Sequence, residues 1–499
     1  MLATVIDLLN IIYILLIIFL IILLILQVLY PGYSIFDFFK SDSKHDPNDD
    51  FNDDDHADKQ VPGIPGESAD NVEIPVMNSD DYQKYNQNFK IEKVTSEYRQ
   101  KYTESQISYQ DLITLIEEKD FIADYTESTR EILREKIKMY TSLKNKVATD
   151  LRLSNGSATP GITGTHDSNL ELLSMMSKEF DDILAVLQEN LRILSKEKIR
   201  QDLRDLMNNK KYGMVSIIGR EDVKNYLARQ IFTFSKNPKV FLNSFQNVRL
   251  YGPSGIGKSK LAESMGYIYA KSHILGRRKY RDYTSKNFTS QYVNESRRLT
   301  YKLLLAGLEG ISFIDEAYGL SEVGVFRDHG TEAITELVNF LDKHMGLSIV
   351  IIAGYEIPME KLIHSNEGLE RRFPHLFKLE KYSSKQLTEI LIKFLKQTSK
   401  SLTIDKKDVN CVYTYIDFID TQMPEVFEKQ AGAMKLLSAS ILEAIYNSKD
   451  HEWLPGNVYL KVRAYLLFLG FNGYLNKYGF AITLPSVASV HSDYSSNQK

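Results

Sequence analysis

The stretch that decides the fold is Gly252-Pro253-Ser254-Gly255-Ile256-Gly257-Lys258-Ser259. It fits the pattern G-x-x-x-x-G-K-[ST], in which glycines let the backbone curl so that successive N–H groups point at phosphate oxygens. Residues 247–251 before the loop read as a short strand, and residues 260–265 after it read as a helix. The N-terminus of that helix adds partial positive charge beside the loop. Strand, glycine loop and helix together predict a phosphate-binding loop in an α/β fold.

The residues of this loop have distinct predicted roles in binding ATP and Mg²⁺. Lys258 would reach the β- and γ-phosphates, and the Ser259 hydroxyl would be a ligand of Mg²⁺. The other residues predicted to line the nucleotide are Gly252, Pro253, Ser254, Gly255, Ile256, Gly257 and Lys260. Taken alone, the loop could also be a glycine-rich turn before an ordinary helix.

A second motif follows at Gly310-Ile311-Ser312-Phe313-Ile314-Asp315-Glu316. An apolar run that ends in two carboxylates is typical of a buried parallel strand, whose C-terminal edge is where open α/β sheets bind ligands. We expect Asp315 to hold Mg²⁺, directly or through water. We expect Glu316 to orient and deprotonate the attacking water. The alternative for this motif in isolation is a surface turn that carries two acids.

Residues 313–318 resemble the Walker B segment of AAA+ ATPases of the CbbX/CfxQ and SpoVK type. Residues 329–334, 350–355 and 365–373 resemble the next segments of the same family, in the same order. The resemblance covers residues 215–440. It implies a P-loop AAA+ core, a parallel sheet with flanking helices, followed by a C-terminal helical lid. It also implies an ATP hydrolase that forms a ring, a hexamer in this family, and remodels or threads another macromolecule.

The resemblance implies a catalytic role for Arg372, which matches the family's arginine before Phe373. In a ring, this arginine would project at the γ-phosphate of the neighbouring subunit and stabilise charge in the transition state. Arg371 is a second candidate for that role. The alternative is that both residues complement the C-terminal dipole of a helix.

Two further sites are implied by the resemblance. Ile218 and Gly219 match the segment that packs against adenine, although a buried turn before a helix explains them equally well. Tyr292 and Val293 stand where the family carries its first pore loop, which would grip an extended substrate. A tyrosine packed in a helix cap is the alternative there.

The predicted lid departs from the family pattern. Gly432 occupies the position where the family carries an arginine in its sensor-2 helix, and only Lys435 keeps a positive charge nearby. This departure predicts weak coupling between lid and phosphate, and slow hydrolysis. Gly354 and Tyr355 stand at the end of the predicted strand over residues 350–353, where AAA+ proteins usually have a polar sensor and the CbbX type resembles this chain.

Residues 8–29, a run of 22, are almost wholly apolar and are interrupted only by Asn10 and Gln27. As a helix they would span about 33 Å, enough to cross a bilayer core. No Lys or Arg precedes the span, which favours an uncleaved transmembrane anchor over a cleaved signal peptide. Lys40 and Lys44 follow it and favour a membrane protein whose remaining chain faces the cytoplasm, where ATP is available.

The region between this span and the ATPase core divides into two parts. Residues 41–60 hold eight aspartates and two lysines, which predicts a disordered tether and makes a metal-binding tract the weaker alternative. Residues 81–210 favour helices, with one break at residues 154–161. Their apolar heptads are too irregular for a strict coiled coil. The two helices are either a hairpin packed on itself or an element that recruits a partner or stabilises the ring.

The net charge, the single cysteine and one basic segment indicate which disulfides and classes of partner are possible. The net charge of −4 indicates no particular partner, and the single cysteine, Cys411, excludes an internal disulfide. Residues 271–302 hold nine Lys or Arg against two acids, interleaved with aromatic residues. Such a segment could bind single-stranded nucleic acid or an acidic peptide, although a solvated basic face is the commoner explanation.

These observations predict a membrane-anchored AAA+ ATPase acting on a macromolecular client, with protein favoured as the client. The alternatives are a nucleic-acid translocase that uses residues 271–302, and a membrane scaffold that binds ATP but barely hydrolyses it. The predicted organisation is a transmembrane anchor (1–36), an acidic linker (37–80), a helical region (81–210), the AAA+ core (211–382), a helical lid (383–450), a C-terminal helical extension (451–485) and a disordered tail (486–499).

Overall fold

The computed structural model describes residues 107–156, 163–290, 295–321, 327–398, 402–447, 460–461 and 464–486. The predicted anchor over residues 8–29 and the acidic linker lie outside these residues, as do Tyr292 and Val293. Within the described parts of the chain, no helix is both long and apolar enough to cross a membrane.

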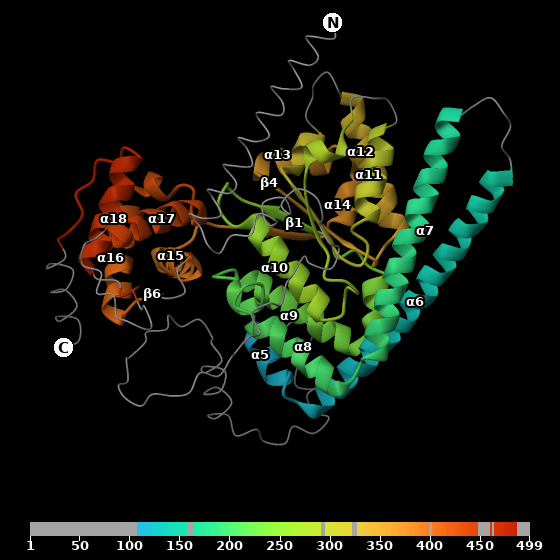
Figure 1. The fold of residues 1–499 in the computed structure, drawn as a ribbon, viewed down its shortest axis with the longest axis horizontal. Coiled ribbons are helices and arrows are strands. Elements are labelled where there is room, and N and C mark those ends of the chain that lie inside the picture. The colour runs from blue at the N-terminus through green and yellow to red at the C-terminus, as the bar shows by residue number, and fades with distance from the viewer. Residues whose placement is uncertain are drawn as a thin grey trace, which may run out of the picture. The chain divides into compact units, whose positions relative to one another are not determined.

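The core of the protein is a parallel sheet of five strands in the order β2-β3-β4-β1-β5 (Figure 1). The strands are β1 (Val248–Tyr251), β2 (Tyr280–Thr284), β3 (Ile311–Asp315), β4 (Ile349–Gly354) and β5 (His375–Lys378). β4 is buried along its whole length, as its unbroken apolar sequence predicts. Because β4 lies between β1 and β3, the glycine loop after β1 and the carboxylates after β3 flank its C-terminal end.

Six helices connect these strands or precede them. They are α9 (Glu221–Lys236), α10 (Lys258–Lys271), α11 (Glu295–Leu305), α12 (Arg327–Lys343), α13 (Glu356–His364) and α14 (Glu367–Arg372). α10 begins directly at Lys258, and most of its residues from Leu261 onward are buried. This places the first turn of α10 beside the C-terminal edge of the sheet.

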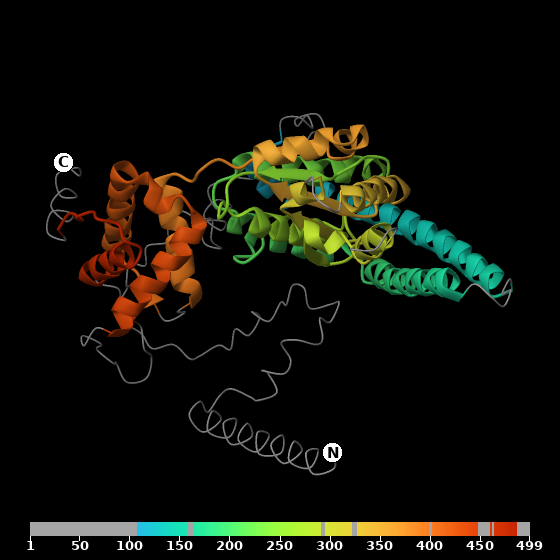
Figure 2. The ribbon, with the colours of Figure 1, turned by 90° about the horizontal axis from the view of Figure 1, so that it is seen from above.

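Four further helices of the described residues lie before α9 in the chain. They are α5 (Tyr109–Leu115), α6 (Lys119–Gly156), α7 (Thr163–Arg192) and α8 (Lys196–Asn208). α6 and α7 run side by side in both views as a long hairpin, hereafter the α6–α7 hairpin (Figures 1 and 2). Tyr140 of α6 packs on Phe180 of α7, and both side chains are fully buried. The hairpin packs on itself, and it also contacts α9 and α11.

The C-terminal helices build a core of their own. They are α15 (Ser384–Thr398), α16 (Lys406–Gln422), α17 (Ala431–Asn447) and α18 (Ala464–Lys477), with a two-stranded sheet of β6 (Leu402–Thr403) and β7 (Leu460–Lys461). Fully buried residues from all four helices form one cluster, including Leu391, Ile416, Leu437 and Phe471. α18 contributes Leu466, Leu467, Phe471 and Leu475 to this cluster.

Candidate nucleotide-binding site

The glycine loop has the backbone geometry that a phosphate cradle requires. Gly255 has φ of 75° and Gly257 has φ of 92°, which lie in the left-handed region that favours glycine. The Gly252 N–H donates to the carbonyl of Gly354 at 3.1 Å, so that the loop leaves β1 beside the end of β4. Sequence, sheet order and backbone angles together place the loop at the ligand-binding edge.

Lys258 lies between this loop and the carboxylates. Its Nζ donates to the carbonyls of Gly252 and Pro253, each at 2.9 Å. Burial lowers the pKa of Lys258 below its usual value, while Asp315 and Glu316 act in the opposite direction. The two carboxylates therefore lie close enough to act electrostatically on the ammonium group.

Asp315 and Glu316 differ in exposure and backbone shape. Asp315 is the last residue of β3, and its Oδ1 accepts a hydrogen bond from the Glu316 N–H at 3.0 Å. Glu316 is exposed and has φ of 48° and ψ of 41°, a left-handed conformation that costs a residue with a side chain about 1–3 kcal/mol. Such strain concentrates at functional sites, because the surrounding structure must hold it. Glu316 can thus present its carboxylate to water.

The residues at this edge fit ATP and Mg²⁺. Ser259 is the second residue of α10, and Asp315 ends the strand two places away from β1 in the sheet. Hydroxyl and carboxylate oxygens suit Mg²⁺, which usually takes only one or two protein ligands beside nucleotide phosphates. Accordingly, no group of three or more His, Cys, Asp or Glu suited to a metal ion occurs among the described residues.

The predicted base pocket lies where the core meets α15. Gly219 has φ of 66°, and a Cβ built on it would lie 2.6 Å from the Gln386 side-chain nitrogen. The Arg220 guanidinium lies over the ring of Tyr382 at 4.3 Å. The Tyr382 hydroxyl in turn donates to the carbonyl of Ile256 in the glycine loop at 3.0 Å. Tyr382 was not predicted, because no motif spacing marks it in the sequence.

The predicted sensor-2 segment reaches the glycine loop through its backbone. A Cβ built on Gly255 would lie 2.1 Å from the carbonyl oxygen of Lys429. The same Cβ would lie 3.5 Å from the backbone nitrogen of Gly432, near the start of α17. Main-chain groups of residues 429–432 thus lie directly beside Gly255 of the glycine loop.

Arg372 does not extend from the surface, as a role in a neighbouring subunit would require. Its Nε donates to Asp342 at 2.9 Å, its second terminal nitrogen also contacts Asp342, and its Nη1 donates to the Gly368 carbonyl at 2.8 Å. Only 6% of Arg372 is exposed. Asp342 of α12 holds the Arg372 side chain in this position. The sequence alone does not indicate that these two residues meet. Arg371 is exposed.

The basic segment over residues 271–302 is mostly engaged by acids of α7 and α8. The pairs are Lys271 with Asp202 and Asp205, Arg277 and Lys279 with Glu179, and Arg298 and Lys302 with Glu171. Much of the positive charge is therefore balanced within the fold. The segment also contains β2, which sequence reasoning missed because this strand has two charged residues in five.

Comparison with known proteins agrees with this geometry. Residues 248–381 match the model of the ATPase family associated with various cellular activities (AAA). The ESX-3 secretion system protein EccA3 of Mycobacterium tuberculosis is 33% identical over 146 residues, which are 29% of this chain and 23% of that protein. The protein CfxQ homolog of Galdieria sulphuraria is 32% identical over 169 residues, covering 32% of this chain and 53% of the relative.

A wider match is to the cfxQ-like protein R730 of Acanthamoeba polyphaga mimivirus, 25% identical over 283 residues, which cover 53% of this chain and 67% of the relative. The chain spans less than a quarter of the length of EccA3, so the similarity concerns one domain. The matched residues begin at β1 and include the glycine loop, β3 with its two carboxylates, and β4. The part of this chain that matches the AAA ATPase family model, residues 248–381, is thus the part that carries the candidate nucleotide-binding site.

Proposed function

We propose that this protein is an ATP hydrolase that couples ATP binding and hydrolysis to the remodelling or threading of a macromolecular client. The observation that carries the proposal is the meeting of Lys258, Asp315 and Glu316 beside a glycine loop with two left-handed glycines. Charged groups of both signs at a phosphate cradle are what phosphoryl transfer to water requires.

Different residues of the site bind the phosphates, activate the water and bind Mg²⁺. Backbone N–H groups of residues 252–259 bind the phosphates, and Lys258 exchanges its two loop carbonyls for phosphate oxygens. Glu316 takes the proton of a water as the water oxygen attacks the γ-phosphorus, and the bond to the ADP oxygen breaks. Ser259 and Asp315 would hold Mg²⁺, which would supply positive charge beside the β- and γ-phosphates.

A ring is the proposed assembly, with a hexamer as the family's form. In such a ring an arginine from one subunit stabilises the charge on the γ-phosphate of the next. Arg371 is the better suited of the two candidates, because its side chain is exposed while Arg372 is held by Asp342 and Gly368. Arg372 then acts as a positioning residue that fixes α14 on α12.

The proposed client is a protein. Matched relatives include proteins named for secretion systems, which supports a protein cargo over a small molecule. The pairing of five of the nine cations of residues 271–302 with acids of α7 and α8 weakens the charge argument for a nucleic-acid translocase. We place the protein at a membrane through residues 8–29, with the ATPase domain in the cytoplasm, on the apolar sequence of that span.

One observation favours a second candidate, a membrane scaffold that binds ATP and hydrolyses it very slowly. Backbone groups around Gly432, in place of an arginine, face the glycine loop. Steady-state ATP turnover of the full chain separates the two functions, with Lys258→Ala and Glu316→Gln as comparisons. Turnover that both variants abolish, with ATP binding kept by Glu316→Gln, supports the hydrolase. ATP binding with no turnover above that of Glu316→Gln supports the scaffold.

A further inference from the structure

We propose that the α6–α7 hairpin controls Mg²⁺-dependent ATP hydrolysis by holding the starts of β2 and β3, with Glu179 as the positioning residue. The inference rests on the proposed hydrolase function. It adds an element outside the matched residues 248–381, since the whole hairpin precedes them in the chain.

Glu179 of α7 binds two cations in the segment that leads into β2. Its carboxylate accepts from the Lys279 Nζ at 3.1 Å and pairs with the Arg277 guanidinium. Burial alone would raise the pKa of Glu179, yet the two cations hold this pKa below its usual value. Lys279 is only 4% exposed, so its charge depends on this carboxylate for compensation.

The segment that carries the two cations also binds the segment that leads into β3, through the Arg277 side chain and two main-chain hydrogen bonds. The Arg277 Nε donates to the carbonyl of Leu308 at 3.2 Å, and the Arg277 N–H donates to the carbonyl of Glu309 at 2.9 Å. Ile311 is the first residue of β3, and its N–H donates to the carbonyl of Lys279 at 2.8 Å. One carboxylate of the hairpin therefore fixes the starts of both strands.

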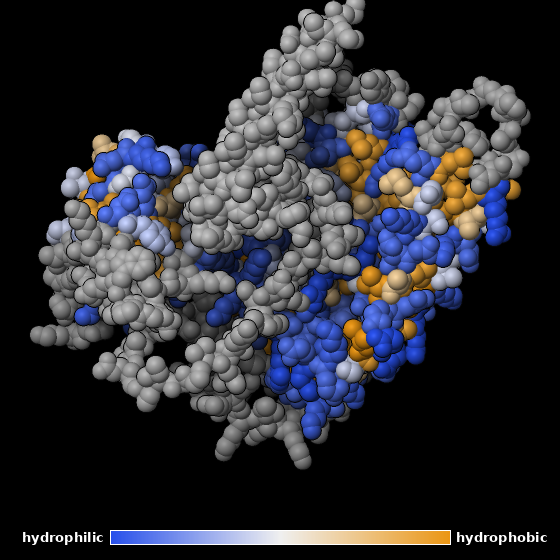
Figure 3. Space-filling view, in the orientation of Figure 1, coloured by the Kyte–Doolittle hydropathy of each residue, from blue (hydrophilic) through white to orange (hydrophobic). Residues whose placement is uncertain are grey.

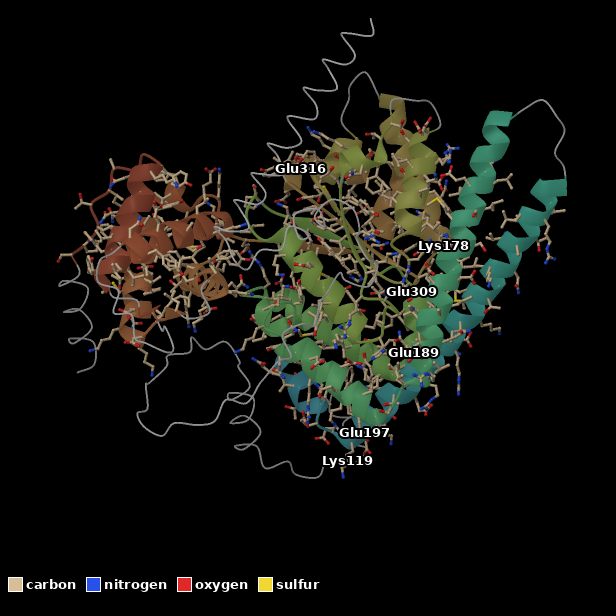
Figure 4. The ribbon with its side chains drawn as sticks, in the orientation of Figure 1. Lys119, Lys178, Glu189, Glu197, Glu309 and Glu316 are labelled. Atoms are coloured by element: carbon tan, nitrogen blue, oxygen red, sulfur yellow. The ribbon has the colours of Figure 1, made fainter. Side chains whose placement is uncertain are left out.

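A second anchor comes from α6. The Lys136 Nζ donates to Glu309 at 2.6 Å and to the carbonyl of Ile274 at 2.9 Å, and Lys136 and Glu309 are both almost fully buried. Figure 4 shows Glu309 beside the hairpin and Glu316 at the far end of β3, with the strand between them. The hairpin thus holds β3 at the end opposite to the catalytic carboxylate.

The pairing of β2 with β3 connects these contacts of the hairpin with the nucleotide site. β2 and β3 pair in register from Tyr280 with Ile311 to Thr284 with Asp315, a run of about 13 Å. The Tyr280 hydroxyl also contacts the carbonyl of Ser259 at 3.4 Å. A shift of β2 at Lys279 would therefore move both residues proposed to hold Mg²⁺. Packed strands move as units, because a close-packed interior transmits small displacements.

The test is Glu179→Gln in the full chain, which keeps the size of the side chain and removes its charge. The control is Glu189→Gln on the same helix, since Glu189 is exposed and pairs only with Arg192 in its own helix among the described residues (Figure 4). Two quantities are measured beside kcat: the affinity for a fluorescent ATP analogue in EDTA, and the gain in that affinity on adding Mg²⁺.

We expect Glu179→Gln to lower kcat on the order of tenfold, as sub-ångström misplacement of reacting groups does. We expect the gain in affinity from Mg²⁺ to shrink, while affinity in EDTA and all values for Glu189→Gln stay within about twofold of wild type. Arg277→Gln should lower the same two quantities at least as far, because it removes the pair with Glu179 and also the side-chain hydrogen bonds to the Leu308 carbonyl.

Two other results would each overturn one proposal, and the measurements tell them apart. A wild-type chain without turnover overturns the proposed hydrolase function. A wild-type chain with turnover, together with a Glu179→Gln chain that melts earlier yet keeps its kcat and its gain from Mg²⁺, shows a purely structural contact and overturns the positioning role.

Discussion

Lys136→Met gives a sharp test of how the α6–α7 hairpin is attached to the ATPase core. Lys136 is 1% exposed and Glu309 is 0% exposed, so the substitution leaves a carboxylate buried without its cation. The Gly276 N–H, which donates to the Glu309 Oε2 at 2.8 Å, remains after the substitution but supplies no compensating charge. Breaking a buried ion pair by removing one partner costs about 3–5 kcal/mol. We expect the free energy of unfolding to fall by that amount.

Urea denaturation followed by far-ultraviolet circular dichroism measures this loss, since both anchored helices contribute strongly to the signal. Lys136→Met/Glu309→Gln should recover most of the stability, because a neutral pair has no unpaired charge. Arg130→Met, which breaks an exposed pair with Glu127 on the same helix, should cost less than about 1 kcal/mol. A loss below about 1 kcal/mol for Lys136→Met would refute the buried-pair reasoning.

Three further predictions concern acid stability, nucleotide binding and the ring. Burial lowers the pKa of His344 to about 4, so the protein should lose about 3 kcal/mol as pH falls from 6.5 towards 4, and His344→Phe should flatten this loss in melting curves between pH 7 and pH 5. Gly255→Ala should lower affinity for a fluorescent ATP analogue by at least about tenfold, because its Cβ would meet the Lys429 carbonyl and φ is positive; unchanged affinity would contradict this. Mixing inactive Arg371→Ala and Glu316→Gln chains should restore part of the turnover if Arg371 acts on a neighbouring subunit, whereas no restoration would favour a role within its own chain.

The local fold around the nucleotide site could be predicted because its signals are short and contiguous. A glycine loop must follow a strand and open a helix, and β1, the loop and α10 do so. An apolar run ending in carboxylates reads as a buried strand, and β3 is one. In both cases the residues that determine the structure are neighbours in the sequence.

Contacts between distant segments could not be predicted. The basic residues before β2 looked like a free surface, but their partner Glu179 lies about a hundred residues earlier in the chain, on α7. Arg372 matched a motif, yet Asp342 on another helix determines where its side chain points. Motif spacing carries no information on such pairs, because they depend on how helices pack against the sheet.

The same limit applies to the base pocket. Ile218 and Gly219 were predicted from resemblance, while the neighbouring Tyr382 precedes α15 and Gln386 lies in the first turn of α15. Their contribution follows from the way α15 meets the glycine loop. Only the folded chain brings these residues beside residues 217–220.

The most direct test of ATP hydrolysis at this site is a single turnover of radiolabelled ATP by excess protein, quenched at intervals and compared with Glu316→Gln. We expect the wild type to convert its bound ATP to ADP and phosphate, and the variant to bind as much ATP and keep it intact. Equal conversion by both proteins, or none by either, would contradict the role of Glu316 as the base that activates water.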